Sequence, residues 1–211
     1  MGFPVPVRKS VVAALAALVW LSMPPPAAAQ DGARSGSPSE ADPEASPGSS
    51  ADSAREADLL RQLREAETPY AAGLVQAELQ GLWSRSGSPS IDLLAKRGRD
   101  ALEAGDPEAA IEHFTAAIDH GPGFAAAYAG RASAYYVTGR MGPAIDDLRQ
   151  ALLLNPDDLD SLQGFAVVLE ELGRPEDALE VWGRVADMNP QSEDAARERD
   201  RLELLIEGQA L

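Results

Sequence analysis

Few side chains of this 211-residue chain could perform acid-base or metal chemistry, and their spacing argues against both. The two histidines, His113 and His120, are seven residues apart. On a helix that spacing separates them by about 10 Å, too far to bind one metal ion without further ligands. Paired acids such as Asp146 and Asp147 are adjacent, so they point to different sides of a helix.

Other chemical sites are absent from the sequence as well. Cysteine does not occur, which excludes disulfides, thiolate metal sites and a cysteine nucleophile. No glycine-rich phosphate loop follows a strand pattern, and no nucleophile lies near a base. The sequence therefore predicts a protein that is not an enzyme, with no catalytic residue, no cofactor and no bound metal.

The dominant pattern is a repeat with a period of 34 residues. Such a period is typical of a stacked array, whose units bury their apolar faces only against each other. Apolar or small residues recur at i, i+4 and i+7 in both halves of each unit, as on one face of a helix. Gly105, Gly139 and Gly173 form one column, Ala110, Ala144 and Ala178 a second, and Pro122, Pro156 and Pro190 a third.

The glycine column predicts the turn inside each unit. Glycine accepts the left-handed backbone that ends a helix. Asp106 then offers a capping oxygen, and Pro107 suits the first turn of the second helix. In the second unit, Gly142-Pro143 occupies the corresponding stretch and predicts a helix that starts late.

These columns resemble the tetratricopeptide repeat (TPR) family. That family has a bulky, a small and a bulky residue along the first helix, then alanine, aromatic, alanine and proline along the second. The resemblance covers three units, residues 91–124, 125–158 and 159–192. It implies an all-α fold, an α-solenoid of three tandem TPR helix-turn-helix units. Arg97 and Arg131 depart from the pattern, because an apolar residue is usual at their place.

Residues 1–29 have the features of a signal peptide. Arg8 and Lys9 precede an apolar run, Val11 to Met23, which is too short to span a bilayer. Cleavage after Ala29 is predicted, with release into the periplasm or outside the cell. The alternative is an uncleaved amphiphilic anchor.

The flanks of the array are predicted from composition and periodicity. Residues 30–53 contain no apolar side chain larger than alanine, so we expect a disordered acidic linker. Residues 54–88 indicate an N-terminal helical hairpin, either a degenerate repeat or a cap, which should cover the helix of residues 91–104. Residues 193–207 indicate a C-terminal capping helix, with a dimerisation helix as the alternative.

The resemblance also places a partner-binding groove on the concave side of the array. Tyr136 is the preferred anchor at its centre, because a rigid amphipathic ring is a common hot spot; ordinary packing is the alternative. The predicted groove residues are Asp92, Arg99, Leu102, Ser133, Tyr136, Val137, Gln163, Val167 and Glu170. We predict an exported adaptor or scaffold that binds a partner peptide or helix there. A structural protein that self-associates is the alternative.

Charge narrows the possible partners. The net charge is −16, which disfavours nucleic acids and anionic lipid. The excess of acids serves solubility or attracts a basic protein segment, and both interpretations stay open. We expect a protein or peptide partner, no nucleic acid, no stable membrane insertion after signal cleavage, and a monomer in preference to an oligomer.

One familiar ligand of the family is excluded on its residues. A TPR subclass clamps the C-terminal carboxylate of a chaperone peptide with Lys, Arg and Asn at set places. Here four of those places hold Ala95, Gly130, Asp160 and Gly164, and only Arg99 is polar in a usable way. Asp160 would repel a carboxylate.

Overall fold

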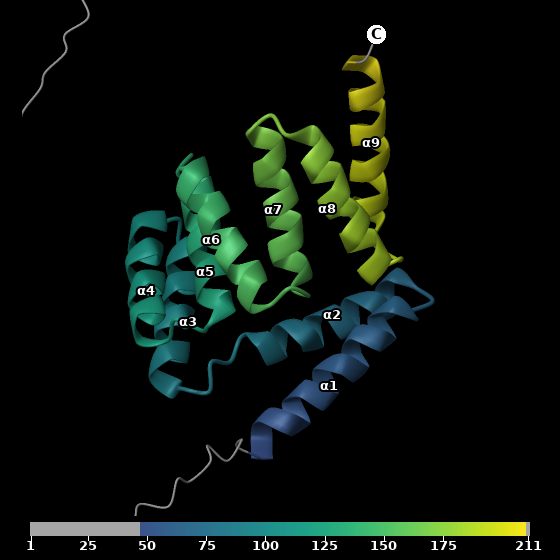
Figure 1. Ribbon diagram of the computed structural model, residues 1–211. Coiled ribbons are helices and arrows are strands. Elements are labelled where there is room, and N and C mark those ends of the chain that lie inside the picture. The colour runs from purple at the N-terminus through teal and green to yellow at the C-terminus, as the bar shows by residue number, and fades with distance from the viewer. Residues whose placement is uncertain (1–46, 210–211) are drawn as a thin grey trace, which may run out of the picture. The chain divides into compact units, whose positions relative to one another are not determined.

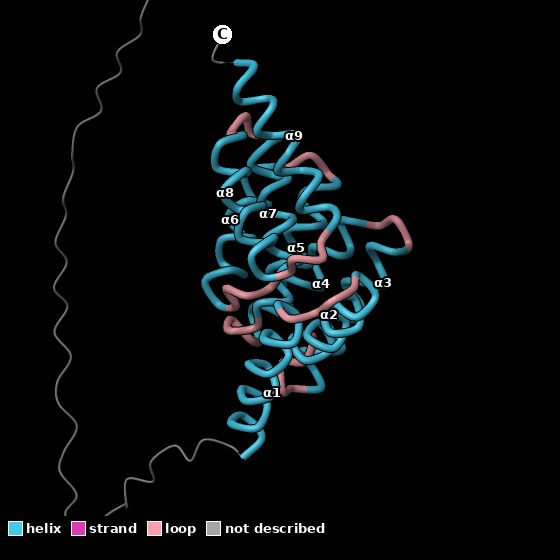
Figure 2. The backbone as a smooth tube through the Cα atoms, turned by 90° about the vertical axis from the view of Figure 1, so that its right-hand side faces the viewer, coloured by secondary structure: helices cyan, strands magenta, loops and turns pink. Residues whose placement is uncertain are grey.

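The computed structural model describes residues 47–209, which belong to one compact unit. All regular elements in this range are helices (Figures 1 and 2). The predicted signal peptide and residues 30–46 of the predicted linker lie outside the described residues. The helices are α1 (Pro47–Arg64), α2 (Pro69–Trp83), α3 (Pro89–Glu103), α4 (Pro107–His120), α5 (Ala125–Val137), α6 (Met141–Leu154), α7 (Leu159–Glu171), α8 (Pro175–Met188) and α9 (Glu193–Gln209).

Helices α3 to α8 form three consecutive helix-turn-helix units, α3–α4, α5–α6 and α7–α8. Each helix packs on the next along the chain, and α9 packs on α8 (Figure 1). This confirms the predicted all-α solenoid of three units. Helix α9 begins at Glu193 as predicted and continues to Gln209, beyond the predicted end at residue 207.

The turns inside the units follow the predicted chemistry. Gly105, Gly139 and Gly173 have φ values of 76°, 73° and 71°, in the left-handed region that other residues avoid. The Asp106 side chain accepts a hydrogen bond from the backbone N–H of Ala109 at 3.1 Å, which caps α4.

The predicted late start of the second helix in the middle unit is wrong. Helix α6 begins at Met141, two residues after Gly139. Helices α4 and α8 begin at the same distance from their own glycines. Pro143 is tolerated because it lies in the first turn, where a backbone N–H has no acceptor within the helix.

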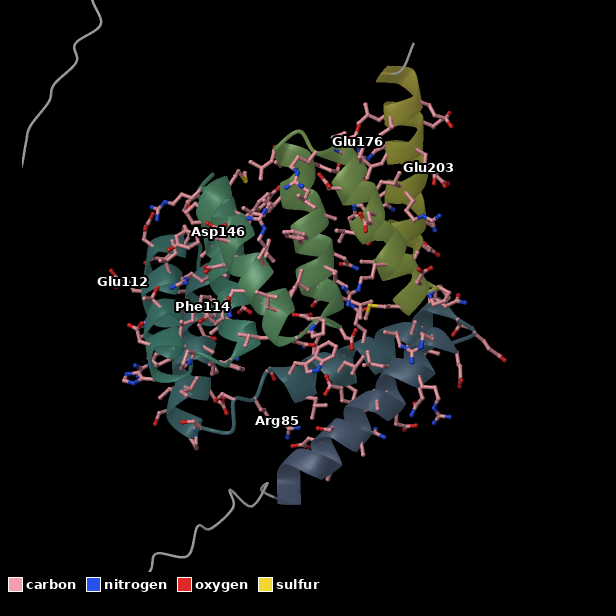
Figure 3. The ribbon with its side chains drawn as sticks, in the orientation of Figure 1. Arg85, Glu112, Phe114, Asp146, Glu176 and Glu203 are labelled. Carbon is pink, nitrogen blue, oxygen red and sulfur yellow. The ribbon has the colours of Figure 1, made fainter. Side chains whose placement is uncertain are left out.

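The Phe114 ring fixes the spacing of the first two units. It is fully buried, and it points into the array while Glu112 of the same helix points away (Figure 3). Cβ atoms built on Gly98 and Gly130 would lie 2.8 Å and 2.3 Å from atoms of this ring. Two helices can therefore approach the ring only because neither position carries a side chain.

Gly130 and Gly164 occupy the same place in consecutive repeats and permit a matched test. In Gly130→Ala the new methyl group would overlap the buried Phe114 ring, so we expect a loss of about 1–3 kcal/mol in the free energy of unfolding. In Gly164→Ala the nearest atom is Leu148 Cδ2 at 3.5 Å, an ordinary contact. That variant should gain up to about 1 kcal/mol from helix propensity. Urea unfolding followed by circular dichroism measures the free energy of unfolding of both variants. An equal gain in stability for Gly130→Ala and Gly164→Ala would contradict the predicted overlap with Phe114.

Arg131 departs from the family pattern because it joins three helices. Its Nε and Nη2 atoms donate to the two carboxylate oxygens of Asp147 at 2.7 and 2.8 Å, and Nη1 donates to Thr115 Oγ1 at 3.1 Å. The guanidinium also lies over the rings of Tyr128 and Tyr135, about 6 Å from each centroid. Removing one partner of such a pair leaves a buried charge unpaired. Arg97, one repeat earlier, is exposed.

The N-terminal hairpin does not lie where the sequence predicted. Leu59, Leu63 and Leu79 are at most 1% exposed and belong to the same apolar cluster as Trp182 and Met188. Helix α1 contacts α8. The hairpin therefore packs against the later repeats and leaves the helix of residues 91–104 uncovered.

The outer side of α3 is mostly charged. Lys96, Arg97 and Asp100 are exposed there, and Lys96 Nζ lies 2.7 Å from Asp100 Oδ2. This face also exposes Leu93, which is 49% exposed. Helix α1 also begins at Pro47, so residues 47–53 are helical and not part of a disordered linker.

Candidate functional site

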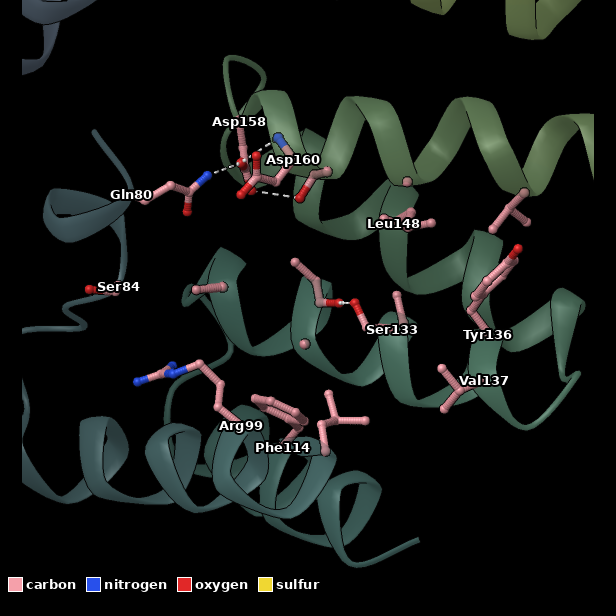
Figure 4. Close-up of a pocket in the computed structure, with 18 of the residues that line it drawn as sticks. Gln80, Ser84, Arg99, Phe114, Ser133, Tyr136, Val137, Leu148, Asp158 and Asp160 are labelled. Atoms are coloured by element: carbon pink, nitrogen blue, oxygen red, sulfur yellow. Dashed lines mark hydrogen bonds between the residues drawn. The ribbon is translucent and has the colours of Figure 1, made fainter. Parts of the chain in front are cut away.

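A groove of about 780 Å³ opens over α3, α5 and α7 on the side of the array that faces α2. Helix α5 forms its middle (Figure 4). Six of the nine predicted partner-binding residues line it: Arg99, Leu102, Ser133, Tyr136, Val137 and Val167. The sequence therefore located the groove, while the role of these residues in binding stays a prediction.

The floor of the groove is made of small and apolar groups. Ala126, Ala129 and Gly130 of α5 line it together with Phe114 of α4 and Leu148 of α6. Small side chains leave the helix backbone accessible to an incoming chain. An apolar floor of this kind suits the packing of a partner's side chains and removes both surfaces from water.

The two sides of the groove carry opposite charges. Arg99 of α3 lies on one side, and Asp158 and Asp160 at the start of α7 lie on the other, with Ser133 between them (Figure 4). Arg99 is exposed and forms no ion pair with any residue of the range 47–209. The groove therefore offers one free cation and two acids to a ligand.

Helix α2 builds the acidic side together with α7. Asp158 caps α7, and its Oδ1 accepts hydrogen bonds from the Asp160 backbone N–H at 3.2 Å and from Gln80 Nε2 at 3.0 Å. Its Oδ2 accepts from Ser161 Oγ at 2.6 Å. Asp160 Oδ1 accepts from Gln76 Nε2 at 2.9 Å. Two amides of the hairpin thus hold both carboxylates at the groove.

The protein around Asp160 disfavours its charged form. Partial loss of hydration raises the pKa of Asp160 above its ordinary value, and the neighbouring Asp158 carboxylate raises it further. The hydrogen bond from Gln76 opposes these two effects but does not cancel them.

Three predicted groove residues lie outside the groove. Asp92 accepts hydrogen bonds from the backbone N–H and the hydroxyl of Ser86, at 2.7 and 2.6 Å, and so fixes the linker before α3. Glu170 pairs with Arg201 of α9 and accepts from Trp182 Nε1 at 3.4 Å. Gln163 is half-buried on α7 and does not line the groove.

Tyr136 lines one end of the groove and not its centre. It stands on the last turn of α5, far from Gln80 in Figure 4. Its side chain is half-buried. Ser133 lies nearer the middle of the groove (Figure 4), and the role of Tyr136 as an anchor stays a prediction.

Sequence reasoning missed the contribution of α2. Gln80, Gly81 and Ser84 line the groove, although the hairpin was expected to pack elsewhere. No local signal marks Gln80, because its partner Asp158 lies 78 positions later in the chain. Asp158 itself could have been found, since an aspartate just before an apolar helical stripe is an N-cap signal.

Residues 47–209 contain no group of three His, Asp or Glu side chains arranged to hold a metal ion. In the same range no helix is long and apolar enough to cross a membrane.

Comparisons with known proteins find tetratricopeptide repeat proteins. The family profile described as "Tetratricopeptide repeat" matches residues 95–161. A TPR repeat-containing protein of Rhizobium etli is 28% identical over 144 residues, which cover 68% of this chain and 71% of that protein. The small glutamine-rich tetratricopeptide repeat-containing protein 2 of Mycosarcoma maydis is 31% identical over 111 residues. That match covers 50% of this chain and 32% of the fungal protein, so the chain spans about a third of it.

Solved structures share the fold. The first TPR of Spaghetti (RPAP3), bound to an HSP90 peptide of sequence SRMEEVD, superposes with a TM-score of 0.55 at 23% identity, covering 56% of this chain and 94% of that one. The Sgt2 TPR domain of Aspergillus fumigatus also superposes with a TM-score of 0.55, at 21% identity. That match covers 58% of this chain and 83% of the Sgt2 chain. The second TPR domain of human RPAP3, in complex with an HSP70 peptide, superposes with a TM-score of 0.50 at 25% identity. That match covers 54% of this chain and 98% of the RPAP3 domain. The fold is thus an α-solenoid of TPR units.

The raised pKa of Asp160 predicts a stability difference that depends on pH. Because the folded chain binds the Asp160 proton more tightly than the unfolded chain, stability falls as the pH rises from about 4 through the folded pKa. Asp160→Asn has no charge to lose and keeps an oxygen for Gln76. We expect this variant to be slightly more stable than the wild type at about pH 7, with the difference vanishing near pH 3.

Urea unfolding midpoints across this pH range test the prediction. Asp157→Asn is the matched control, because it removes a neighbouring charge that faces Arg184 at 3.6 Å. The control should show no gain at neutral pH. If Asp160→Asn is less stable than the wild type at pH 7, the conclusion that folding disfavours the charge of Asp160 is contradicted.

Proposed function

We propose that this chain is an exported, non-catalytic adaptor of the tetratricopeptide repeat family, which holds a segment of a partner protein in the groove over α3, α5 and α7. The observation that carries the proposal is the groove itself. It combines an apolar floor with polar groups on both sides, and six residues predicted from the repeat pattern line it.

The solved structures support a peptide as the ligand. Two of the similar TPR domains are in complex with short HSP90 or HSP70 peptides. An extended segment fits a groove whose floor is small and whose walls carry hydrogen-bonding groups, because its backbone and alternate side chains are then both contacted. The partner is therefore a protein that presents a flexible stretch.

Substitutions in the groove test this function. Tyr136→Ala removes a half-buried ring at one end, and Arg99→Glu reverses the free cation on one wall. We expect each to reduce the recovery of the same partner by about tenfold or more in a quantitative pull-down from the native compartment. Leu153→Ala is the control, because Leu153 is a large apolar side chain, 78% exposed, outside the groove. Unchanged recovery with both groove variants would place the binding site elsewhere.

Export is supported by the order of charged, apolar and small residues within positions 1–29. Cleavage after Ala29 would release the mature chain into the periplasm or the medium. Mass spectrometry of protein from the envelope fraction should find Gln30, or its cyclised form, as the first residue. Peptides that retain Met1 in that fraction would contradict cleavage.

A further inference from the structure

The acidic side of the groove has no internal counter-ion. Within residues 47–209, neither Asp158 nor Asp160 forms an ion pair with a Lys or Arg. Their donors are the neutral amides of Gln76 and Gln80, the Ser161 hydroxyl and a backbone N–H. The two carboxylates therefore line the groove without an ion pair, and the cation of the groove, Arg99, lies on the opposite wall.

Two other acids have a cationic partner. Asp157 lies on the same loop and faces Arg184 at 3.6 Å. Asp147 receives two hydrogen bonds from Arg131. Asp158 and Asp160 therefore differ from these two acids, because only neutral groups donate to them.

The two carboxylates have different roles. Asp158 is 7% exposed, and its hydrogen bonds to three donors are already made inside the protein. Asp160 is exposed and has one donor. Asp158 thus fixes the start of α7 and contributes charge, while Asp160 has oxygen lone pairs free for a ligand.

We propose that the groove takes an extended segment of a partner protein in which a Lys or Arg side chain lies against Asp160. The charge of Asp158 reinforces the attraction from behind, and the residues beside the cation rest on the floor formed by Ala126, Ala129 and Gly130. The inference rests on the proposed function and adds the chemistry of the partner. Charge complementarity of this kind selects partners and orients them in a groove.

Two other occupants fit less well. The HSP90 peptide in the similar structure ends in EEVD, and an acidic tail would meet the like charges of Asp158 and Asp160. A metal ion would find two carboxylates and neutral amides, with no third acid or histidine arranged to complete its ligand set. A cationic side chain needs only one or two carboxylate oxygens.

A peptide selection provides the test. The purified protein is panned against random twelve-residue segments displayed between two carrier domains, so that no free terminus is offered. Enriched segments should share a Lys or Arg next to small or apolar residues. One such segment is then synthesised with blocked ends, together with a version that has glutamine in place of the cation, and binding is measured by fluorescence anisotropy.

The wild type should bind the cationic peptide about tenfold more tightly than its glutamine version. Asp160→Asn should bind the cationic peptide about tenfold more weakly than the wild type and should no longer distinguish the two peptides. Asp157→Asn, which removes the same charge from the same loop outside the groove, should behave as the wild type. This cycle separates a direct pairing from a general change in net charge.

The possible failures are distinguishable. Full discrimination retained by Asp160→Asn, or enrichment of acidic segments, would overturn the cation subsite and leave the adaptor function intact. If no segment is enriched, or if binding is insensitive to Tyr136→Ala as well as to Asp160→Asn, the proposed use of the groove fails and this inference fails with it.

Discussion

The array depends on the contact between the Phe114 ring and the bare backbones of Gly98 and Gly130. A β-carbon at either glycine would come within 3 Å of the ring, so Gly98 sets the approach of α3 to α4 inside the first unit, and Gly130 sets the approach of α5 to that unit. Close packing of this kind transmits any change in volume to the neighbouring helices. How closely α5 can approach this ring therefore decides how the second unit packs on the first.

The same requirement produces the groove. Helix α5 must be small on the side that meets Phe114, and its Ala126, Ala129 and Gly130 continue as the groove floor. A bulky residue there would fill the hollow from inside. Gly130 therefore meets the Phe114 ring and lines the groove at the same time, and the charged residues that line the groove, Arg99, Asp158 and Asp160, come from α3 and the start of α7.

The sequence predicted what periodicity encodes and missed what depends on distant pairing. The columns of glycine, alanine and proline predicted the three units and their turns, because each column has a local physical role, while the groove residues were implied by the resemblance to the family. Residues 54–88 were predicted to form a helical hairpin, but the sequence did not predict the surface against which Leu59, Leu63 and Leu79 pack. The bonds from α2 to Asp158 and Asp160 join segments about eighty residues apart, and no local pattern could predict them.

Asp147 and Asp160 illustrate the proposed difference between a charge that stabilises the fold and a charge that meets a partner. Asp147 is satisfied from within by Arg131, and the pair ties α5 to α6. Asp160 is held by a neutral amide beside a second acid, an arrangement that raises its pKa and disfavours its charge. Folding alone would favour a neutral residue or a nearby cation at that place. An acid without an internal cation on the wall of the groove fits the proposed partner, which brings a cation of its own.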